Sequence, residues 1–131
     1  MSVDWQIETI RAFVIPQKRE RYVEAVSKDK HRRKFIAELS HFGDFDPRWI
    51  VQITSSSQNS EGILALLKKH GAPATCKVIS ELVQLDCQEI PLEEALQKVI
   101  GNQMGTILCC VPGRLAYFES EETRFILERA K

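Results

Sequence analysis

The sequence predicts an α+β fold in which N-terminal helices precede a β-α-β-α-β-β succession with a mixed, partly antiparallel sheet. The first observation is the helical spacing of Val3, Ile7, Ile10 and Val14. The second is that short runs rich in β-branched residues alternate with helical patterns after residue 49. The third is that no internal repeat and no Pro/Gly-rich linker divides a chain of 131 residues. We therefore expect a single domain over residues 1–131, with a helical part at 1–43 and a mixed α/β part at 49–131.

The helical part contains two sets of apolar residues. The first helix should end before Pro16, because the residue that precedes a proline disfavours helical backbone. The apolar pattern then resumes, but residues 27–34 are polar. Either one long helix has a solvated middle, or Ser27 or Asp29 caps a further helix that runs to about Phe42; we favour two segments. Gly43 should end this part, because glycine accepts the left-handed backbone common after a helix.

The second part is expected to alternate strands and helices. Strands are predicted at residues 49–54, 75–81, 106–111 and 115–119, and helices at residues 60–70 and 91–100. The first β-α-β unit would be a parallel, right-handed crossover. The last two strands would form a hairpin around Pro112 and Gly113, which suit a type II turn. Residues 123–130 are compatible with a strand or a helix, and we favour a strand because the segment leaves little room for a three-turn helix.

Charge is concentrated in residues 17–34, where eight basic and three acidic residues give +5 in a chain of zero net charge. The basic residues are Lys18, Arg19, Arg21, Lys28, Lys30, Arg32, Arg33 and Lys34. Such a face attracts nucleic acid, phosphate or an acidic protein, although solvated helix faces also look like this. Only Tyr22 and Phe35 are interleaved aromatic residues. Dedicated nucleic-acid binders have more interleaved aromatic residues and a more positive total charge than this chain.

The four cysteines indicate a reduced protein. Cys76, Cys87, Cys109 and Cys110 have no C-x-x-C spacing, so no metal site is predicted. Cys109 and Cys110 lie in a strand-like run and should point to opposite faces as small buried hydrophobes. The N-terminus lacks the apolar core of a signal peptide, and the longest uncharged run, residues 99–113, is too short to cross a bilayer. We expect a cytoplasmic protein with no membrane partner.

A hydroxyl-rich loop at residues 54–60 separates a predicted strand from a predicted helix. Its candidate anion-binding residues are Ser55, Ser56, Ser57, Ser60 and Gly62. Ligands of parallel sheets bind at the carboxyl ends of strands, where free helix N–H groups favour an anion. The loop lacks the glycine pattern and the lysine of a P-loop, and serines are also ordinary turn and cap residues.

No catalytic motif is present. Asp44 and Asp46 could hold a divalent cation but are more simply turn formers. The spacings of nucleophilic, zinc-dependent and dinucleotide-binding motifs are missing, so no catalytic residue and no cofactor is predicted. We predict a small binding or adaptor protein whose basic helices face an acidic protein partner or a second copy of the chain. One alternative is a nucleic-acid-binding accessory protein that uses residues 17–34. The other is a phosphate- or nucleotide-handling enzyme that uses residues 54–60 with Glu81 or Asp46.

Overall fold

The N-terminal apolar pattern forms three helices in the computed structural model, which describes residues 4–129. Helix α1 spans Asp4–Phe13 and ends before Pro16, as predicted. Helices α2 (Arg19–Ser27) and α3 (Asp29–Glu38) are separated only by Lys28, whose backbone is extended. Two segments are therefore present. Neither Ser27 nor Asp29 caps the second, because Lys28 takes the N-cap position without a side-chain bond. A 3-10 turn, η2 (Leu39–His41), follows α3.

The sheet has six strands, and all of them pair antiparallel. They are β1 (Ile50–Val51), β2 (Thr75–Ser80), β3 (Glu89–Pro91), β4 (Thr106–Val111), β5 (Leu115–Glu119) and β6 (Arg124–Glu128). Their order across the sheet is β1-β6-β5-β4-β2-β3. The predicted mixed sheet is wrong, because all neighbouring strands are antiparallel. Strands β1 and β2 do run in the same direction, as predicted for the first β-α-β unit, because four antiparallel pairings separate them. The β4-β5-β6 meander occupies the middle of the sheet, so β1 and β2 never become neighbours.

The two edge strands differ from the predictions: β1 is shorter than expected, and β3 was not expected. Strand β1 covers two residues of the predicted 49–54, because Pro47–Trp49 form a 3-10 turn and only Ile50 and Val51 pair with β6. Strand β3 was not predicted; it pairs with the start of β2 after a tight turn in which Cys87 has a φ of 65°. Pro91 is tolerated in β3 because an edge strand needs no donor on its free side.

The local predictions in the second half are confirmed. Helices α4 (Ser60–Lys69) and α5 (Leu92–Val99) form where expected, and the Asn59 side chain caps α4 by accepting from the Gly62 N–H at 2.7 Å. Strands β4 and β5 form the hairpin at Pro112 and Gly113, with Gly113 at a φ of 76°. The ambiguous C-terminal segment is strand β6, which pairs along all of β5.

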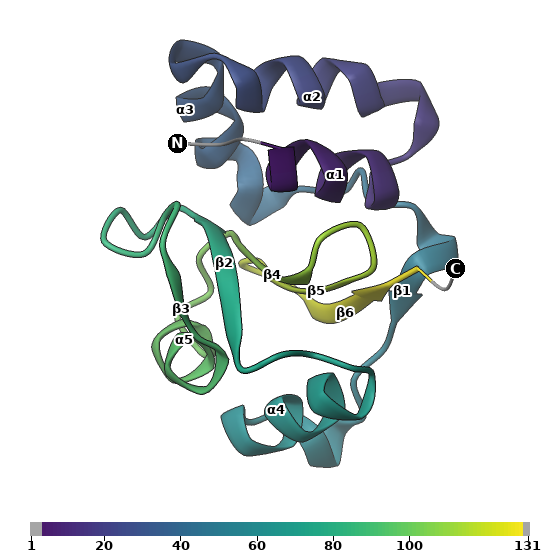
Figure 1. Cartoon of the computed structure of the whole chain (residues 1–131), viewed down its shortest axis with the longest axis vertical. Helices are drawn as coiled ribbons and strands as arrows, with labels where there is room; N and C mark the ends of the chain where they lie inside the picture. Colours follow the sequence, from purple (N-terminus) through teal and green to yellow (C-terminus); the bar gives the residue numbers. More distant parts are fainter. Residues whose placement is uncertain (1–3, 130–131) are drawn as a thin grey trace.

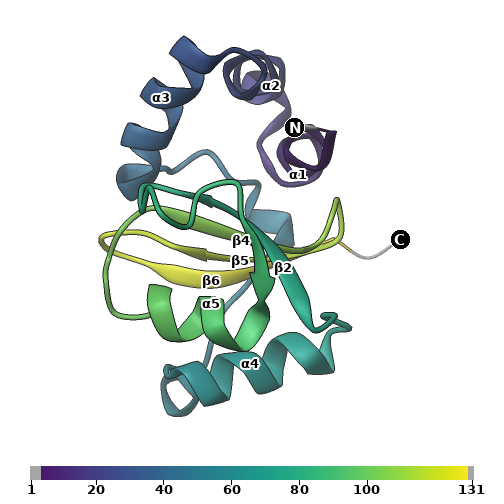
Figure 2. The same ribbon diagram turned by 60° about the vertical axis from the view of Figure 1, so that its left-hand side comes forward.

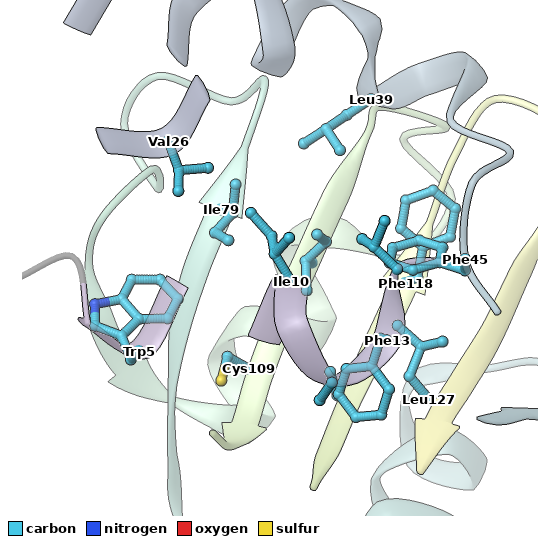
Figure 3. Close-up of a cluster of buried hydrophobic side chains, with 14 of the residues drawn as sticks. Trp5, Ile10, Phe13, Val26, Leu39, Phe45, Ile79, Cys109, Phe118 and Leu127 are labelled. Atoms are coloured by element: carbon cyan, nitrogen blue, oxygen red, sulfur yellow. The ribbon is translucent and has the colours of Figure 1, made fainter. Parts of the chain in front are cut away.

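Helices cover both faces of the sheet and create two cores. Helices α1–α3 arch over one face, while α4 and α5 lie under the other (Figures 1 and 2). The upper core contains Trp5, Ile10, Phe13, Leu39, Ile79, Cys109 and Phe118 (Figure 3). The lower core contains Ile63, Leu67, Leu96, Cys110 and Tyr117. Adjacent residues of one strand therefore enter different cores, and the prediction that Cys109 and Cys110 point oppositely is confirmed.

A chain of aromatic rings links the helical arch to the sheet. The Tyr22 ring packs on Phe42 at 5.1 Å between centroids, Phe42 on Phe45 at 4.7 Å, and Phe45 on Phe118 of β5 at 4.8 Å. Edge-to-face contacts of this kind add to the burial of apolar area. The position of α2 is therefore tied to the sheet through packed aromatic rings. None of the helices within residues 4–129 combines the length and apolarity that a membrane crossing requires.

Candidate functional site

Side chains of helices α2 and α3 line a cavity of about 400 Å³. The helices diverge from the break at Lys28, so their facing side chains leave space between them. The lining residues are Arg21, Tyr22 and Ala25 from α2, and Lys30, His31, Lys34, Phe35 and Glu38 from α3. Three of the basic residues singled out in the sequence, Arg21, Lys30 and Lys34, thus meet around one hollow.

The floor of this cavity is aromatic and firmly held. The Tyr22 and Phe35 rings lie 5.5 Å apart between centroids, and Phe35 is buried at 3% exposure. The Tyr22 hydroxyl donates to an Asp44 carboxylate oxygen at 2.5 Å. Burial, and then this hydrogen bond, raise the pKa of Tyr22 from 10.0 to about 12. The tyrosine therefore stays neutral and fixed at neutral pH.

The rim of the cavity carries unpaired positive charge. Lys30 and Lys34 are exposed and form no hydrogen bond or ion pair with any residue in 4–129. The Arg21 guanidinium lies 5.8 Å from the centroid of the Tyr22 ring, a cation–π contact that leaves its charge in place. Glu38 is the only carboxylate among the lining residues. The cavity can therefore attract carboxylate or phosphate groups while offering an apolar floor.

A second cavity, of about 430 Å³, continues from the first along the same helices. It shares Arg21, Tyr22 and Glu38 with the first cavity. Its other lining residues are Lys18, Ala37, His41, Phe42, Gly43 and Asp44. We call the two cavities together the α2–α3 groove. Lys30 and Lys34 stand at one end of this groove and Lys18 and His41 at the other, where Asp44 pairs with Lys18; Glu38 lines both cavities.

The eight predicted basic-face residues divide into three groups. Lys18 and Lys28 are exposed but paired, with Asp44 at 3.5 Å and Glu24 at 3.4 Å respectively. Arg21, Lys30, Arg33 and Lys34 are exposed and have no ion pair among the described residues. Arg19 and Arg32 are half-buried and point inward. These last two do not belong to the exposed face that the sequence suggested.

Arg19 and Arg32 bind interior groups instead. Arg19 donates to the Val14 carbonyl at 3.1 Å. Arg32 donates hydrogen bonds to both carboxylate oxygens of Asp86, with an Nη2–Oδ1 distance of 2.9 Å. Its Nε also donates to the Gln6 side-chain oxygen at 3.1 Å. The hydrogen bond to Asp86 raises the pKa of Arg32. Arg32 thereby ties α3 to α1 and to the turn between β2 and β3, a role that depends on tertiary neighbours.

In the hydroxyl-rich loop at residues 54–60, which we call the serine loop, the side chains bond to one another. Ser55–Ser57 form a 3-10 turn, in which the Thr54 hydroxyl lies 3.2 Å from the Ser57 hydroxyl. A Cβ atom on Gly62 would lie 2.8 Å from the Ser57 Cα, so this glycine makes room for the backbone of the loop. Ser60 is the first residue of α4. The loop follows edge strand β1, so no parallel strand ends beside it.

The two predicted sites are not brought together. The α2–α3 groove lies above the sheet, and the serine loop leads into α4 below it (Figure 1). The carboxylates considered with the loop have other partners: Glu81 accepts from the Gly105 N–H at 2.6 Å, and Asp46 accepts from Arg48. The hydrogen bonds from Arg48 hold the pKa of Asp46 below its usual range. Anion binding by Ser55, Ser56, Ser57, Ser60 and Gly62 stays a prediction.

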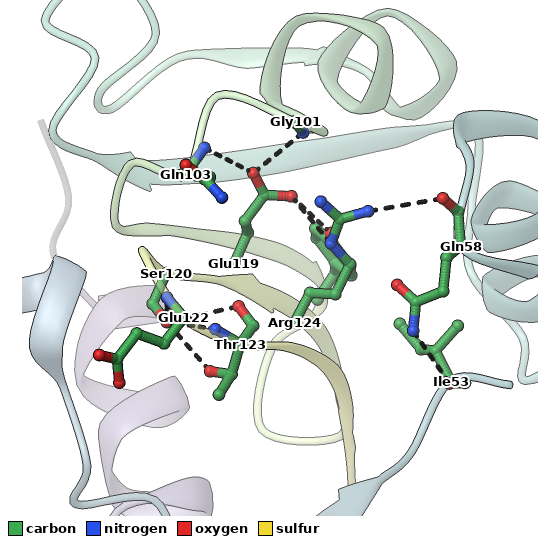
Figure 4. Close-up of polar contacts among 10 residues, drawn as sticks. Ile53, Gln58, Gly101, Gln103, Glu119, Ser120, Glu122, Thr123 and Arg124 are labelled. Carbon is green, nitrogen blue, oxygen red and sulfur yellow. Dashed lines mark hydrogen bonds and ion pairs between the residues drawn. The ribbon is translucent and has the colours of Figure 1, made fainter. Parts of the chain in front are cut away.

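Sequence reasoning missed a polar network at the end of β5 (Figure 4). Glu119 is only 1% exposed and accepts from the Gly101 N–H, the Gln103 N–H and the Tyr117 hydroxyl at 2.9–3.1 Å. Arg124 lies 3.6 Å away and completes its charge balance. The two-residue spacing of Tyr117 and Glu119 in a strand was the available signal, because it places both side chains on one face.

This network supports the structure more than it offers a binding site. A cavity of about 460 Å³ lies beside it, lined in part by Gln58, Gln103 and Arg124. Glu121 and Glu122 also line this cavity, and the positive charge of Arg124 is balanced by Glu119. The hydrogen bonds to Glu119 stabilise Gln103 at an unusual φ of 58°. Within residues 4–129, no group of three or more His, Cys, Asp or Glu side chains could hold a metal ion.

Comparisons of the chain with protein-family models, with curated proteins and with solved structures gave no match. Support for a function therefore comes from the geometry and charge of the α2–α3 groove.

Proposed function

We propose that this protein is a binding module that docks an acidic protein partner on the α2–α3 groove. The observation that carries the proposal is the unpaired positive charge of Lys30 and Lys34 beside an apolar floor. A surface that combines cations with a concave apolar patch matches a partner that presents carboxylates around an apolar side chain.

Helix electrostatics support a role in binding over a role in folding. Lys30 and Lys34 are four residues apart on α3, so two like charges face each other on one helix surface. Lys30 also lies in the first turn of α3, at the positive end of the helix dipole. Each arrangement opposes helix stability by a few tenths of a kcal/mol. By contrast, Lys28 has its expected partner, Glu24, one turn away. A ligand with negative charge would relieve both repulsions.

Nucleic acid is the alternative occupant, and the ring geometry favours it less. Binding of single strands relies on exposed aromatic faces that stack on bases. Phe35 is buried, and the Tyr22 ring is packed against Phe35 and Phe42 with its hydroxyl held by Asp44. A second copy of the chain is one partner to consider, because its residues outside 17–34 carry a net −5.

The proposal is tested by neutralising the two lysines. The variant Lys30→Gln/Lys34→Gln should bind a fluorescein-labelled oligo-glutamate peptide about threefold to tenfold more weakly than the wild type at low salt. Its thermal stability should be unchanged or slightly higher, because like-charge repulsion is removed. Fluorescence anisotropy and circular dichroism measure the two effects.

The matched control is Lys68→Gln/Lys69→Gln, which removes the same charge from exposed positions at the end of α4. It should bind the peptide as the wild type does. If both variants bound the peptide equally weakly, the loss of affinity would be an effect of net charge alone, and the proposal of docking on the groove would be wrong. Mixed-sequence oligonucleotides are titrated in parallel; binding of these, without binding of the peptide, would favour the nucleic-acid alternative. Size-exclusion chromatography over a range of concentrations detects self-association.

A further inference from the structure

The shape of the α2–α3 groove restricts the partner more than its charge does. Its first cavity, about 400 Å³, is at the small end of ligand sites, which span roughly 300–1,000 Å³. It is large enough for one bulky side chain and too small for a helix or a folded surface. Its floor consists of Ala25, Tyr22 and Phe35, of which Ala25 is the smallest.

The charges lie around this floor and are absent from it. Lys30 and Lys34 stand on the α3 side of the first cavity, and Arg21 stands on the α2 side between the two cavities. Lys18, His41 and Asp44 line the second cavity, where Lys18 pairs with Asp44 at 3.5 Å and the His41 ring lies 3.4 Å from Glu121. Glu38, which lines both cavities, would repel a ligand that carried negative charge along its whole length. The groove therefore matches a segment with carboxylates at its ends and an apolar group between them.

Resting on the function proposed above, we infer that the α2–α3 groove binds an extended acidic peptide segment whose single aromatic side chain enters the first cavity and packs on its floor of Tyr22 and Phe35. The aromatic ring extends the series of ring contacts that already joins Tyr22, Phe35 and Phe42. Carboxylates on one side of that ring face Lys30 and Lys34, and those on the other side face Arg21, because Lys18 is already paired with Asp44. A small free anion would reach only one end of the groove.

The test compares two labelled peptides that differ at one position, an oligo-glutamate peptide with a central Phe and the same peptide with a central Ser. The wild type should bind the Phe peptide about tenfold more tightly, because burial of an aromatic side chain is worth at least that factor. Equal affinity for the two peptides would overturn the inference and leave the proposed function standing. Failure to bind either peptide would overturn both.

A cavity-filling variant provides the second arm. Ala25→Leu places a branched side chain in the cavity without changing any charge, so it should remove the preference for Phe and keep the binding of the Ser peptide. Ala65→Leu, at an exposed position of α4, is the matched control and should keep the preference. A preference for Phe that survives Ala25→Leu, with circular dichroism showing a folded protein, would place the aromatic side chain elsewhere and overturn the inference.

Discussion

At the scale of single residues, neighbouring arginines on α3 have opposite roles. Arg32 contacts Asp86 and Gln6 in the interior, and its side chain is 14% exposed. Arg33, the next residue, is exposed and has no ion pair among the described residues. Asp86 also accepts from the Ser80 N–H at 2.9 Å, so it orders the turn after β2 while it holds Arg32. Removal of one partner would leave the other half-buried and unpaired, which is costly.

We predict that Arg32→Ala lowers the free energy of unfolding by about 2 kcal/mol, below the 3–5 kcal/mol of a fully buried pair because this pair keeps some contact with water. Arg33→Ala should change it by no more than about 0.5 kcal/mol. Urea denaturation measures both. Equal effects of the two substitutions would show that the Arg32–Asp86 pair does not hold α3 in place.

Tyrosine titration reports the environment of the groove floor. The chain has two tyrosines, Tyr22 and Tyr117. Burial raises the pKa of Tyr22 to about 12, and burial together with Glu119 raises the pKa of Tyr117 further. We predict that the near-ultraviolet phenolate signal of the native protein is absent at pH 10, the pH at which unfolded tyrosine is half ionised.

The raised pKa of Tyr22 makes the folding stability depend on pH. A folded-state pKa above the unfolded value favours folding below pH 10, and this contribution is lost as the pH rises from 10 to about 12. Tyr22→Phe should leave only the later ionisation of Tyr117. Phenolate absorbance near pH 10 in a folded protein would show that the Tyr22 hydroxyl is open to water and the floor is not fixed.

At the scale of elements, the helical arch and the sheet meet through one very close backbone contact. A Cβ atom on Gly105, just before β4, would lie 2.4 Å from the Leu39 Cβ and 2.5 Å from the Ser40 nitrogen. Turn η2 therefore rests directly on the start of β4. The Glu121 N–H also donates to the Ser40 carbonyl at 3.1 Å. The end of α3, and with it the position of Lys34 and Glu38, is set by this contact.

We predict that Gly105→Ala destabilises the protein by about 2 kcal/mol or more, because backbone atoms of η2 must move to admit the methyl group. Gly43→Ala is the control: nothing lies within 4 Å of its Cβ position and its φ is not positive, so stability should be equal or slightly higher. Thermal unfolding followed by circular dichroism compares the two. A tolerated Gly105→Ala would mean that η2 can leave the sheet at little cost.

At the scale of the whole molecule, one sheet separates two cores, and each core contains one of two adjacent cysteines. The reactivity of each thiol therefore shows whether its own core is open. Cys109 contacts the Thr9 hydroxyl of α1 at 3.3 Å in the upper core, and Cys110 lies in the lower core with Cys76. Burial raises the pKa of all three buried thiols, to about 11 for Cys109 and about 12 for Cys76. Cys87 is half-buried, beside Asp86 in the turn before β3.

We predict that an alkylating reagent modifies Cys87 first in the native protein, and that Cys109 and Cys110 react only on unfolding. In increasing urea the last two should become reactive together, as expected if residues 1–131 unfold as the single domain that the sequence predicts. Tandem mass spectrometry resolves the two positions. Earlier reaction of Cys109 would instead show that the helical arch opens separately from the α4–α5 side.

The sequence by itself determined the features that depend on neighbours along the chain. The spacing of apolar residues, Pro112 and Gly113 were sufficient for α1, α4, α5 and the β4–β5 hairpin. They act through contacts within a few residues, so their effect is visible in a short window. The positive charge of Arg21, Lys30 and Lys34 was likewise evident.

Only the tertiary structure decided which of these parts meet. The β4-β5-β6 meander in the middle of the sheet separates β1 from β2, and no local pattern encodes that order. Arg32 turns inward because Asp86, 54 residues later, lies opposite it. The groove exists because α2 and α3 diverge at Lys28 while packed aromatic rings hold both helices against the sheet. Long-range pairing depends on the burial of whole faces, which is a property of the folded chain and not of any single segment.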